Sequence, residues 1–229
     1  MTELVVAPCS YKAATYAVEN WHYSKKMPAG KCYRIGVWED GKFIGALVFS
    51  WGANRSLSSP YGLEMTECVE LVRVACRRHI LPITKFVSLA IKKLKSDNPG
   101  IRLIISFADL HQGHVGTIYQ AGNWFFLGRT APKFDYKMPD GSILNRRAYT
   151  GKSFDGKVRP LPSGAVKVDS PPKLRYAMPL DKSIRREIAK MALPYKNAVE
   201  GLEESHPDSV REVQVQSLPT ALGVRDASR

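Results

Sequence analysis

Apolar positions in the first part of the chain change from helical to extended spacing. Behind Ser10, a residue type that caps helices, four apolar residues recur at helical spacing, which predicts a helix that ends near WHYSKKMP (21–28). Two β-rich segments follow at residues 33–38 and 42–51, with an Asp-Gly pair between them. An Asp-Gly pair in this position predicts a β-hairpin.

The middle of the chain alternates short apolar runs with amphipathic segments. Runs typical of buried strands occupy residues 67–78, 101–107 and 123–128. A helix with one apolar and one lysine-rich face is expected at about 84–96, and another at about 114–121. Together with the N-terminal helix and hairpin, this order predicts a mixed α/β sheet with flanking helices over residues 1–150.

The pattern changes after residue 150. Residues 151–196 are basic and contain several prolines, which predicts an extended wrapping segment rather than a second domain. Within it, a short basic helix is expected, capped by Asp181 and ending before Pro194. Residues 197–229 lack periodicity and are expected to form a disordered tail.

Charge also separates the body of the chain from this tail. The chain has 34 Lys and Arg against 21 Asp and Glu, a net charge of +13. Residues 197–229 contain three arginines and six acids, so the first 196 residues carry +16. Such a body suggests a polyanionic partner, most simply nucleic acid, although many basic proteins bind nothing specific.

Other bulk features exclude some classes of protein. No apolar run approaches the roughly 20 residues of a membrane span, so no membrane partner is expected. The four cysteines form no CxxC pair and are expected to be free thiols. The N-terminal residues lack the pattern of a signal peptide. We therefore expect a cytoplasmic protein.

Polar residues gather where the apolar run at 101–107 ends. Ser106 and Asp109 lie at this end, and ligands of open α/β sheets bind at the carboxyl ends of strands. His111 and His114 follow, and one carboxylate with two imidazoles is the ligand set of a non-haem iron site. The motif is short, however, and Asp109 could equally cap the following turn.

Two further groups of residues are candidates for chemistry. His22, Tyr23 and Ser24 end the first helix, where an imidazole could act as a base and a phenol as a donor. The alternative is a histidine stabilised by the helix dipole. Arg73 lies in an apolar strand and either pairs with a carboxylate or binds an anion in a cleft. Strand alternation places Glu70 on the opposite face from Arg73.

The order of elements, together with GTIYQAGNWFFLG (116–128), resembles the GNAT acyltransferase fold. In that family a glycine-rich loop before a helix binds the pyrophosphate of acyl-CoA through backbone N–H groups. Here the loop is RRHILPIT (77–84), which has no glycine and in which Pro82 removes one donor. Arg77 and Arg78 could replace some phosphate contacts as charges.

Five sequence blocks resemble the Mom-type DNA modification proteins of Mu-like phages. In order they are WHYSKKMP (21–28), GVWEDGKFIGALVF (36–49), ELVRVA (70–75), ISFADLHQGHVGTIYQAGNW (105–124) and RYAMPLDKSIRREI (175–188). The resemblance implies a GNAT-derived enzyme that converts adenine in DNA to N6-carbamoylmethyladenine and so shields phage DNA from restriction. It also implies an iron ion and a small-molecule donor, acetyl-CoA or a related compound.

This resemblance turns the candidate residues into an expected site. The expected catalytic residues are His22, Tyr23, Ser106, Asp109 and Tyr119. The expected substrate-binding residues are Ser24, Arg73, Arg77 and Arg78, and the expected metal ligands are Asp109, His111 and His114. Trp51 and Tyr61 are candidates to hold an extruded base. Two alternatives stay open: N-acyltransfer from acetyl-CoA to a small amine or a protein, and DNA binding without catalysis.

Overall fold

The computed structural model describes residues 2–51, 56–131, 133–144, 146, 149, 159–170 and 172–196. In chain order its elements are β1 (Leu4–Pro8), α1 (Tyr11–Trp21), β2 (Cys32–Glu39), β3 (Lys42–Ser50), η1 (Ser59–Tyr61), β4 (Cys68–Cys76), α2 (Ile83–Asp97), β5 (Leu103–Asp109), η2 (Leu110–Gln112), α3 (Thr117–Ala121), β6 (Phe125–Arg129), β7 (Lys133–Lys137), β8 (Ile143–Leu144), β9 (Val166–Ser170), β10 (Lys173–Pro179) and α5 (Lys182–Met191).

The chain divides into two compact units, Met1–Ala198 and Val199–Arg229, and every described element belongs to the first. The tail predicted at 197–229 lies outside the described residues. Among the described residues, no helix is long and apolar enough to cross a membrane.

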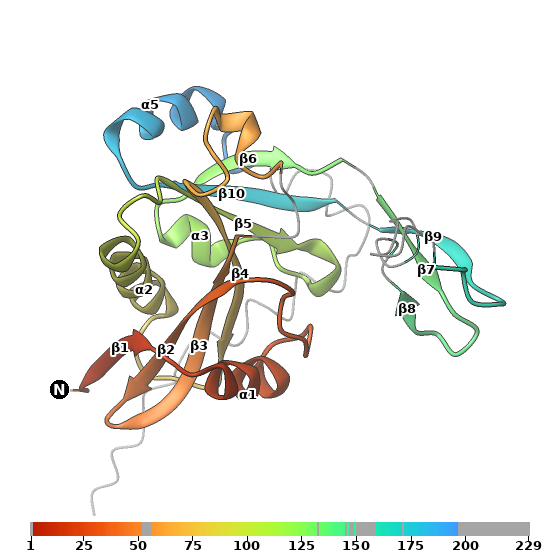
Figure 1. The fold of residues 1–229 in the computed structure, drawn as a ribbon, viewed down its shortest axis with the longest axis horizontal. Coiled ribbons are helices and arrows are strands. Elements are labelled where there is room, and N and C mark those ends of the chain that lie inside the picture. Colours follow the sequence, from red (N-terminus) through yellow and green to blue (C-terminus); the bar gives the residue numbers. More distant parts are fainter. Residues whose placement is uncertain are drawn as a thin grey trace, which may run out of the picture. The chain divides into compact units, whose positions relative to one another are not determined.

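Seven strands form one mixed sheet in the order β1-β2-β3-β4-β5-β10-β6 (Figure 1). Neighbouring strands are antiparallel except for β4 and β5, which are parallel and pair only over Cys68–Glu70 and Leu103–Ile105. The backbone ladder between these two central strands therefore ends early, and we call the region beyond it the β4/β5 split. A separate three-stranded sheet has the order β8-β7-β9.

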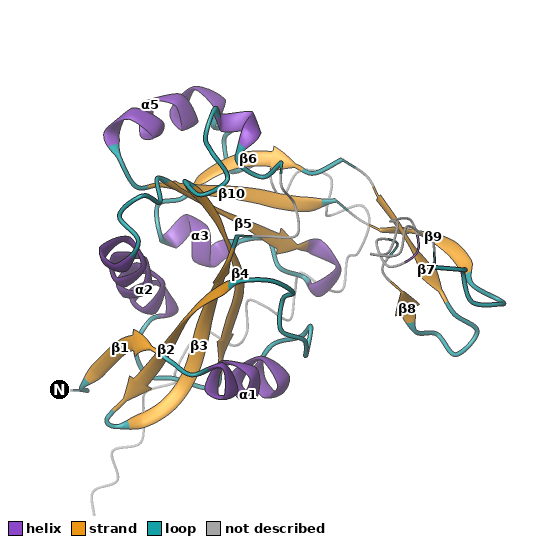
Figure 2. Cartoon of the chain, viewed as in Figure 1, coloured by secondary structure: helices purple, strands orange, loops and turns teal. Residues whose placement is uncertain are grey.

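Helices cover both faces of the large sheet (Figure 2). Apolar residues of α2 and α3 pack on one face, with residues such as Phe49 and Leu71. Helix α1 packs against Ala46 and Val48, and α5 packs against Ile105. The strand registers place these last three positions on one face, opposite α2 and α3. We call the two sides the α2/α3 face and the α1/α5 face.

This architecture confirms the predicted mixed α/β sheet with flanking helices, and the local signals account for it. The Ser10 side chain accepts the amide N–H of Ala13 at 3.1 Å and so caps α1. Asp40 and Gly41 have φ of 47° and 73°, as a tight turn between β2 and β3 requires. Asp181 caps α5, as expected.

The expected boundary at residue 150 is not where the sheet ends. Strand β10 comes from the segment predicted to wrap around the core, yet it lies between β5 and β6 in the sheet. Over the first four residues of its sequence, KLRYAMP, partly exposed basic residues alternate with buried apolar ones, which is the pattern of a half-buried strand. The basic composition of the whole segment concealed this alternation.

The helix expected at about 114–121 is also shorter than predicted. Residues 110–112 form the short helix η2, and α3 begins only at Thr117. Gly113 and Gly116 separate the two with φ of 66° and 82°, a left-handed conformation that ends helices.

A β-bulge overturns the expectation about Glu70 and Arg73. Ser50 of β3 lies opposite Glu70, and Val48 lies opposite Arg73. Residues 48–50 of β3, three in number, thus match the four residues 70–73 of β4, so one residue of β4 is extra. Since Ser50 and Val48 share a face, Glu70 and Arg73 do too, and the prediction of opposite faces is wrong.

Candidate functional site

On the α2/α3 face, side chains bridge the β4/β5 split. The hydroxyl of Ser106 donates to the carbonyl of Leu71 at 2.8 Å and lies 2.6 Å from the phenol of Tyr119. A hydroxyl has one proton, and the carbonyl accepts it, so Tyr119 donates between the two hydroxyls. Burial raises the pKa of Tyr119 to about 12. Both side chains are therefore neutral, and they join the strands where the backbone ladder has ended.

On the α1/α5 face, five side chains meet at the carboxyl end of β5. The ammonium of Lys173 lies 2.7 Å from the carboxylate of Asp109, and the phenol of Tyr23 lies near enough to the same carboxylate for the two groups to interact. The ring of Tyr23 stacks on His22, with centroids 4.3 Å apart, and meets the ring of His114 edge-on at 5.4 Å. We call these five residues the Tyr23 cluster.

The turn after α1 holds two members of this cluster in place. The amide of Ser24 donates to Nδ1 of His22 at 3.1 Å, and the Ser24 hydroxyl lies 2.9 Å from the same nitrogen. Nδ1 therefore acts as an acceptor, which leaves the proton of the neutral ring on Nε2. Arg73 of β4 donates through Nε to the carbonyl of Lys26 at 3.1 Å, so the turn is fastened to the sheet beside the split.

Burial and nearby cations set the protonation of the cluster. Burial, and to a lesser extent nearby basic groups, lower the pKa of His22 to about 4; in decreasing order of effect these groups are Arg73, His114, Lys25 and Lys173. Burial raises the pKa of Tyr23, and the nearby carboxylate of Asp109 adds to the increase. At neutral pH, His22 is thus a neutral imidazole and Tyr23 a neutral phenol, and both lie beside one carboxylate and several positive charges.

The structure brings together some of the expected catalytic residues and separates others. His22, Tyr23 and Asp109 meet in the Tyr23 cluster. Ser106 and Tyr119 lie on the other face of the sheet, and Ser106 is fully buried. Ser106 and Asp109 are three residues apart on one strand, so alternation directs them to opposite faces. Ser106 and Asp109, both expected among the catalytic residues, therefore do not lie together.

Lys173 is a member of the cluster that the sequence pattern did not single out. It lies directly opposite Asp109 in the antiparallel register of β10 and β5. The sequence did contain a signal for this position. In KLRYAMP the first and third residues are partly exposed, whereas the second and fourth are buried. Reading that stretch as a strand would have placed Lys173 and Arg175 on one face.

The expected cofactor loop at residues 77–84 is already occupied by an internal anion. The carboxylate of Glu39, which is only 5% exposed, accepts the amide N–H of Ile80 at 3.0 Å and of Leu81 at 2.8 Å. These amides are donors of the kind that a pyrophosphate would need. The loop as folded therefore does not fit the pyrophosphate of acyl-CoA.

Arg77 and Arg78, expected to bind substrate, are exposed and line a surface pocket beside this loop. Glu39 and Lys42 also line it. None of the lining residues belongs to the Tyr23 cluster, so the structure does not bring these two arginines together with the expected catalytic residues.

The described residues cover only part of the expected iron site. Among them, which do not include the side chain of His111, no three His, Cys, Asp or Glu side chains are grouped to hold a metal ion. Asp109 is engaged by Lys173 and Tyr23, and His114 meets the ring of Tyr23.

The two residues expected to hold an extruded base, Trp51 and Tyr61, pack against different apolar clusters. Trp51 packs against the apolar cluster of the α2/α3 face. Tyr61 packs against the cluster beneath α5 and interacts with Arg175, while burial raises its pKa. Of the two, Tyr61 shares the α1/α5 face with the Tyr23 cluster.

A family model described as the Mom protein family matches residues 3–197. The methylcarbamoylase mom of Escherichia phage Mu is 26% identical over 130 residues, which are 55% of this chain and 54% of that protein. The chain thus spans about half the length of this relative.

Several solved acetyltransferase structures are similar in chain arrangement. A Bacillus subtilis acetyltransferase in complex with CoA has a TM-score of 0.43 and 14% identity, over 79% of this chain and 100% of that one. A mutant of the spermidine N-acetyltransferase SpeG from Vibrio cholerae has a TM-score of 0.46 and 9% identity, over 80% and 98% of the two chains. Likenesses at these scores and identities leave the reaction undetermined.

Proposed function

This chain belongs to the Mom protein family, and we propose that it is a DNA modification enzyme that converts adenine to its N6-carbamoylmethyl form at the Tyr23 cluster. The methylcarbamoylase name of the phage Mu relative supports the type of group transferred. The basic body of the chain, +16 over its first 196 residues, supports DNA as the substrate.

One observation favours this site above all. The carboxylate of Asp109, paired with the ammonium of Lys173 and near the phenol of Tyr23, lies at the carboxyl end of a central strand next to a neutral imidazole. Open α/β sheets bind their ligands at this end. The side chain of Asp109 is 14% exposed, so it is accessible and yet largely withdrawn from water.

Two members of the cluster, Asp109 and His22, act directly on the base in the proposed reaction. The N6 nitrogen of adenine forms a bond to the methylene carbon of the donor, the bond from that carbon to its leaving group breaks, and the leaving group departs with the electron pair. Asp109 accepts the proton that N6 loses, since a carboxylate paired with one ammonium retains lone pairs for a further partner. Nε2–H of His22 donates to a ring nitrogen of the base.

The target base reaches this site outside the double helix. The N6 nitrogen is paired inside duplex DNA, so the enzyme extrudes the adenine or acts on single strands. Ser24 and Arg73 hold the turn that carries His22 and Tyr23, and they contribute by positioning it. Arg77 and Arg78, which lie away from the cluster, contribute phosphate contacts.

The alternative, N-acyltransfer from acetyl-CoA to a small amine or protein, has less support. It would need a pyrophosphate at the loop where Glu39 already accepts two amide N–H groups. The proposed donor is therefore a small molecule with an activated carbamoylmethyl group that does not rely on this loop.

The test is to express the protein with a reporter plasmid, digest the plasmid to nucleosides and measure modified deoxyadenosine by mass spectrometry. We expect the product with the wild type and its loss with Asp109→Asn or Tyr23→Phe. Tyr16→Phe is the matched control, since Tyr16 is an exposed tyrosine on α1. Unmodified plasmid from soluble wild-type protein would refute the proposal.

A further inference from the structure

Helix α5 presents a strongly basic surface on the α1/α5 face. It buries Ile184 and Ile188 against the sheet, and its exposed side carries four basic residues and one acid. These five are Lys182, Arg185, Arg186, Lys190 and Glu187. Only Lys190 pairs with the acid, at 2.9 Å, among the contacts described for these side chains. The exposed row therefore has an excess of positive charge.

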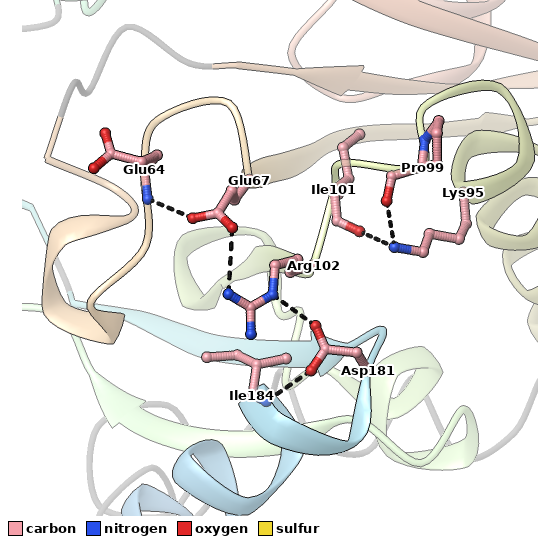
Figure 3. A network of polar contacts seen from close by, with 8 residues as sticks. All are labelled: Glu64, Glu67, Lys95, Pro99, Ile101, Arg102, Asp181 and Ile184. Carbon is pink, nitrogen blue, oxygen red and sulfur yellow. Dashed lines mark hydrogen bonds and ion pairs between the residues drawn. The ribbon is translucent and has the colours of Figure 1, made fainter.

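A network of ion pairs fixes this helix on the sheet (Figure 3). Arg102, just before β5, donates to Asp181 at 2.7 Å and to Glu67 at 3.2 Å. Asp181 also accepts the amide N–H of Ile184 at 2.9 Å, and Glu67 accepts that of Glu64 at 2.9 Å. The start of α5 is thus tied to the loop before β4, so its basic row has a defined place.

Basic residues of β10 continue this row toward the Tyr23 cluster. Lys173 and Arg175 lie two residues apart on β10, opposite Asp109 and Phe107. Arg175 also interacts with the phenol of Tyr61 of η1, and η1 contacts α5. Positive side chains therefore extend along one face of the sheet, from the proposed catalytic carboxylate to α5.

One arginine of the row is already oriented. The guanidinium of Arg185 lies 5.3 Å from the ring centroid of Phe125 on β6. Stacking on an aromatic ring limits the freedom of an arginine while its N–H groups stay available. Guanidinium groups in such positions bind phosphate oxygens in a defined geometry.

The lysines of α2 provide a contrast within the same molecule. They lie on the opposite face of the sheet, and two of them have internal partners. Lys93 pairs with Asp97 at 2.8 Å, and Lys95 donates to the carbonyls of Pro99 and Ile101 at 2.7 Å. A high content of lysine alone therefore does not distinguish the two helices, whereas their position relative to the Tyr23 cluster does.

We propose that the phosphate backbone of DNA lies along α5 and β10, bound by Lys182, Arg185, Arg186, Lys190 and Arg175, so that the target adenine enters the Tyr23 cluster from the α1/α5 face. The inference rests on the proposed DNA modification and adds to it a surface and an orientation. Charge complementarity selects a polyanion, and the continuity of the basic row with the cluster selects the substrate's own backbone.

The test measures binding of the full chain to a fluorescently labelled DNA duplex at several salt concentrations. In the variant Lys182→Ala/Arg186→Ala, the slope of log affinity against log salt should become shallower by about 2, since each lost phosphate contact removes about 0.9. The matched control is Lys85→Ala/Lys92→Ala on α2, which removes the same charge from exposed positions and should keep the wild-type slope.

The outcomes separate this inference from the proposed function. An equal decrease of the salt slope in both variants, or a decrease only in the α2 variant, would overturn the α5 surface. Plasmid modification by the wild type would in that case still support the proposed enzyme. A wild type that neither binds duplex DNA nor modifies plasmid would overturn both. Equal melting temperatures of the three proteins establish that the variants are folded.

Discussion

The ammonium of Lys173 and the carboxylate of Asp109 lie 2.7 Å apart, although 64 residues separate them in the chain. The antiparallel register of β5 and β10 places the two residues directly opposite each other. In the proposed reaction this pair keeps the carboxylate oriented beside Tyr23, so it is the first target for mutation.

Replacing Lys173 by Met should reduce modified deoxyadenosine at least tenfold, because the carboxylate loses its charged partner. The free energy of unfolding should fall by only about 1 kcal/mol, since the lysine side chain is 44% exposed. Product per plasmid and urea unfolding measure the two effects. Lys173→Arg retains a cation and should recover part of the product; an active Lys173→Met variant would exclude Lys173 from the mechanism.

Replacing Ser106 by Ala should act mainly on stability. It leaves the carbonyl of Leu71 without the Ser106 donor and the phenol of Tyr119 without its acceptor, at a cost of about 2 kcal/mol. Urea unfolding measures this cost, and Tyr119→Phe should lower stability as well. A Ser106→Ala protein of wild-type stability that makes no product would instead show a direct part in the reaction.

Stability should depend on the protonation of His22. Burial lowers its pKa from 6.5 to about 4, so between these values the unfolded chain binds a proton that the folded protein does not. The free energy of unfolding is therefore intact above pH 6.5 and falls as the pH drops toward 4, by at most about 3 kcal/mol. His22→Gln should flatten the profile in this window, measured by denaturant unfolding at several pH values. An unchanged slope would contradict the assignment.

Glu39 should stabilise the loop before α2. Glu39→Ala removes the acceptor of the Ile80 and Leu81 amides and should cost about 2 kcal/mol, whereas Glu39→Gln keeps one acceptor oxygen and should cost less. Glu64→Ala, at an exposed glutamate, is the control. We also expect CoA not to raise the melting temperature of the wild type, because this carboxylate occupies the amides. A clear increase with CoA would show that the ligand displaces Glu39.

The cap of α5 can be separated from its ion pair at Asp181. Asp181→Ala loses both the bond to the Ile184 amide and the pair with Arg102, and it should cost about 1–2 kcal/mol. Asp181→Asn retains a capping oxygen without the charge and should recover about half of this loss. Thermal unfolding of both variants measures the difference. Equal losses of stability in the two variants would mean that the capping hydrogen bond contributes little.

Much of the fold could be predicted because its signals are local. A capping serine with helical spacing predicts α1, an Asp-Gly pair predicts the hairpin, and Asp181 before an amphipathic stretch predicts α5. Each signal acts within a few residues of the backbone that it shapes. Strand β10 was missed because its identity depends on pairing with β5 and β6, which are distant in the chain.

The candidate site could likewise be predicted only in part. The sequence by itself determined which residues could carry chemistry, among them His22, Tyr23 and Asp109. Only the tertiary structure decided which of them meet, because strand register and pleat set the face of each side chain. Alternation separates Ser106 from Asp109, and the register with β10 supplies Lys173. These are properties of paired strands, and a single strand read alone does not contain them.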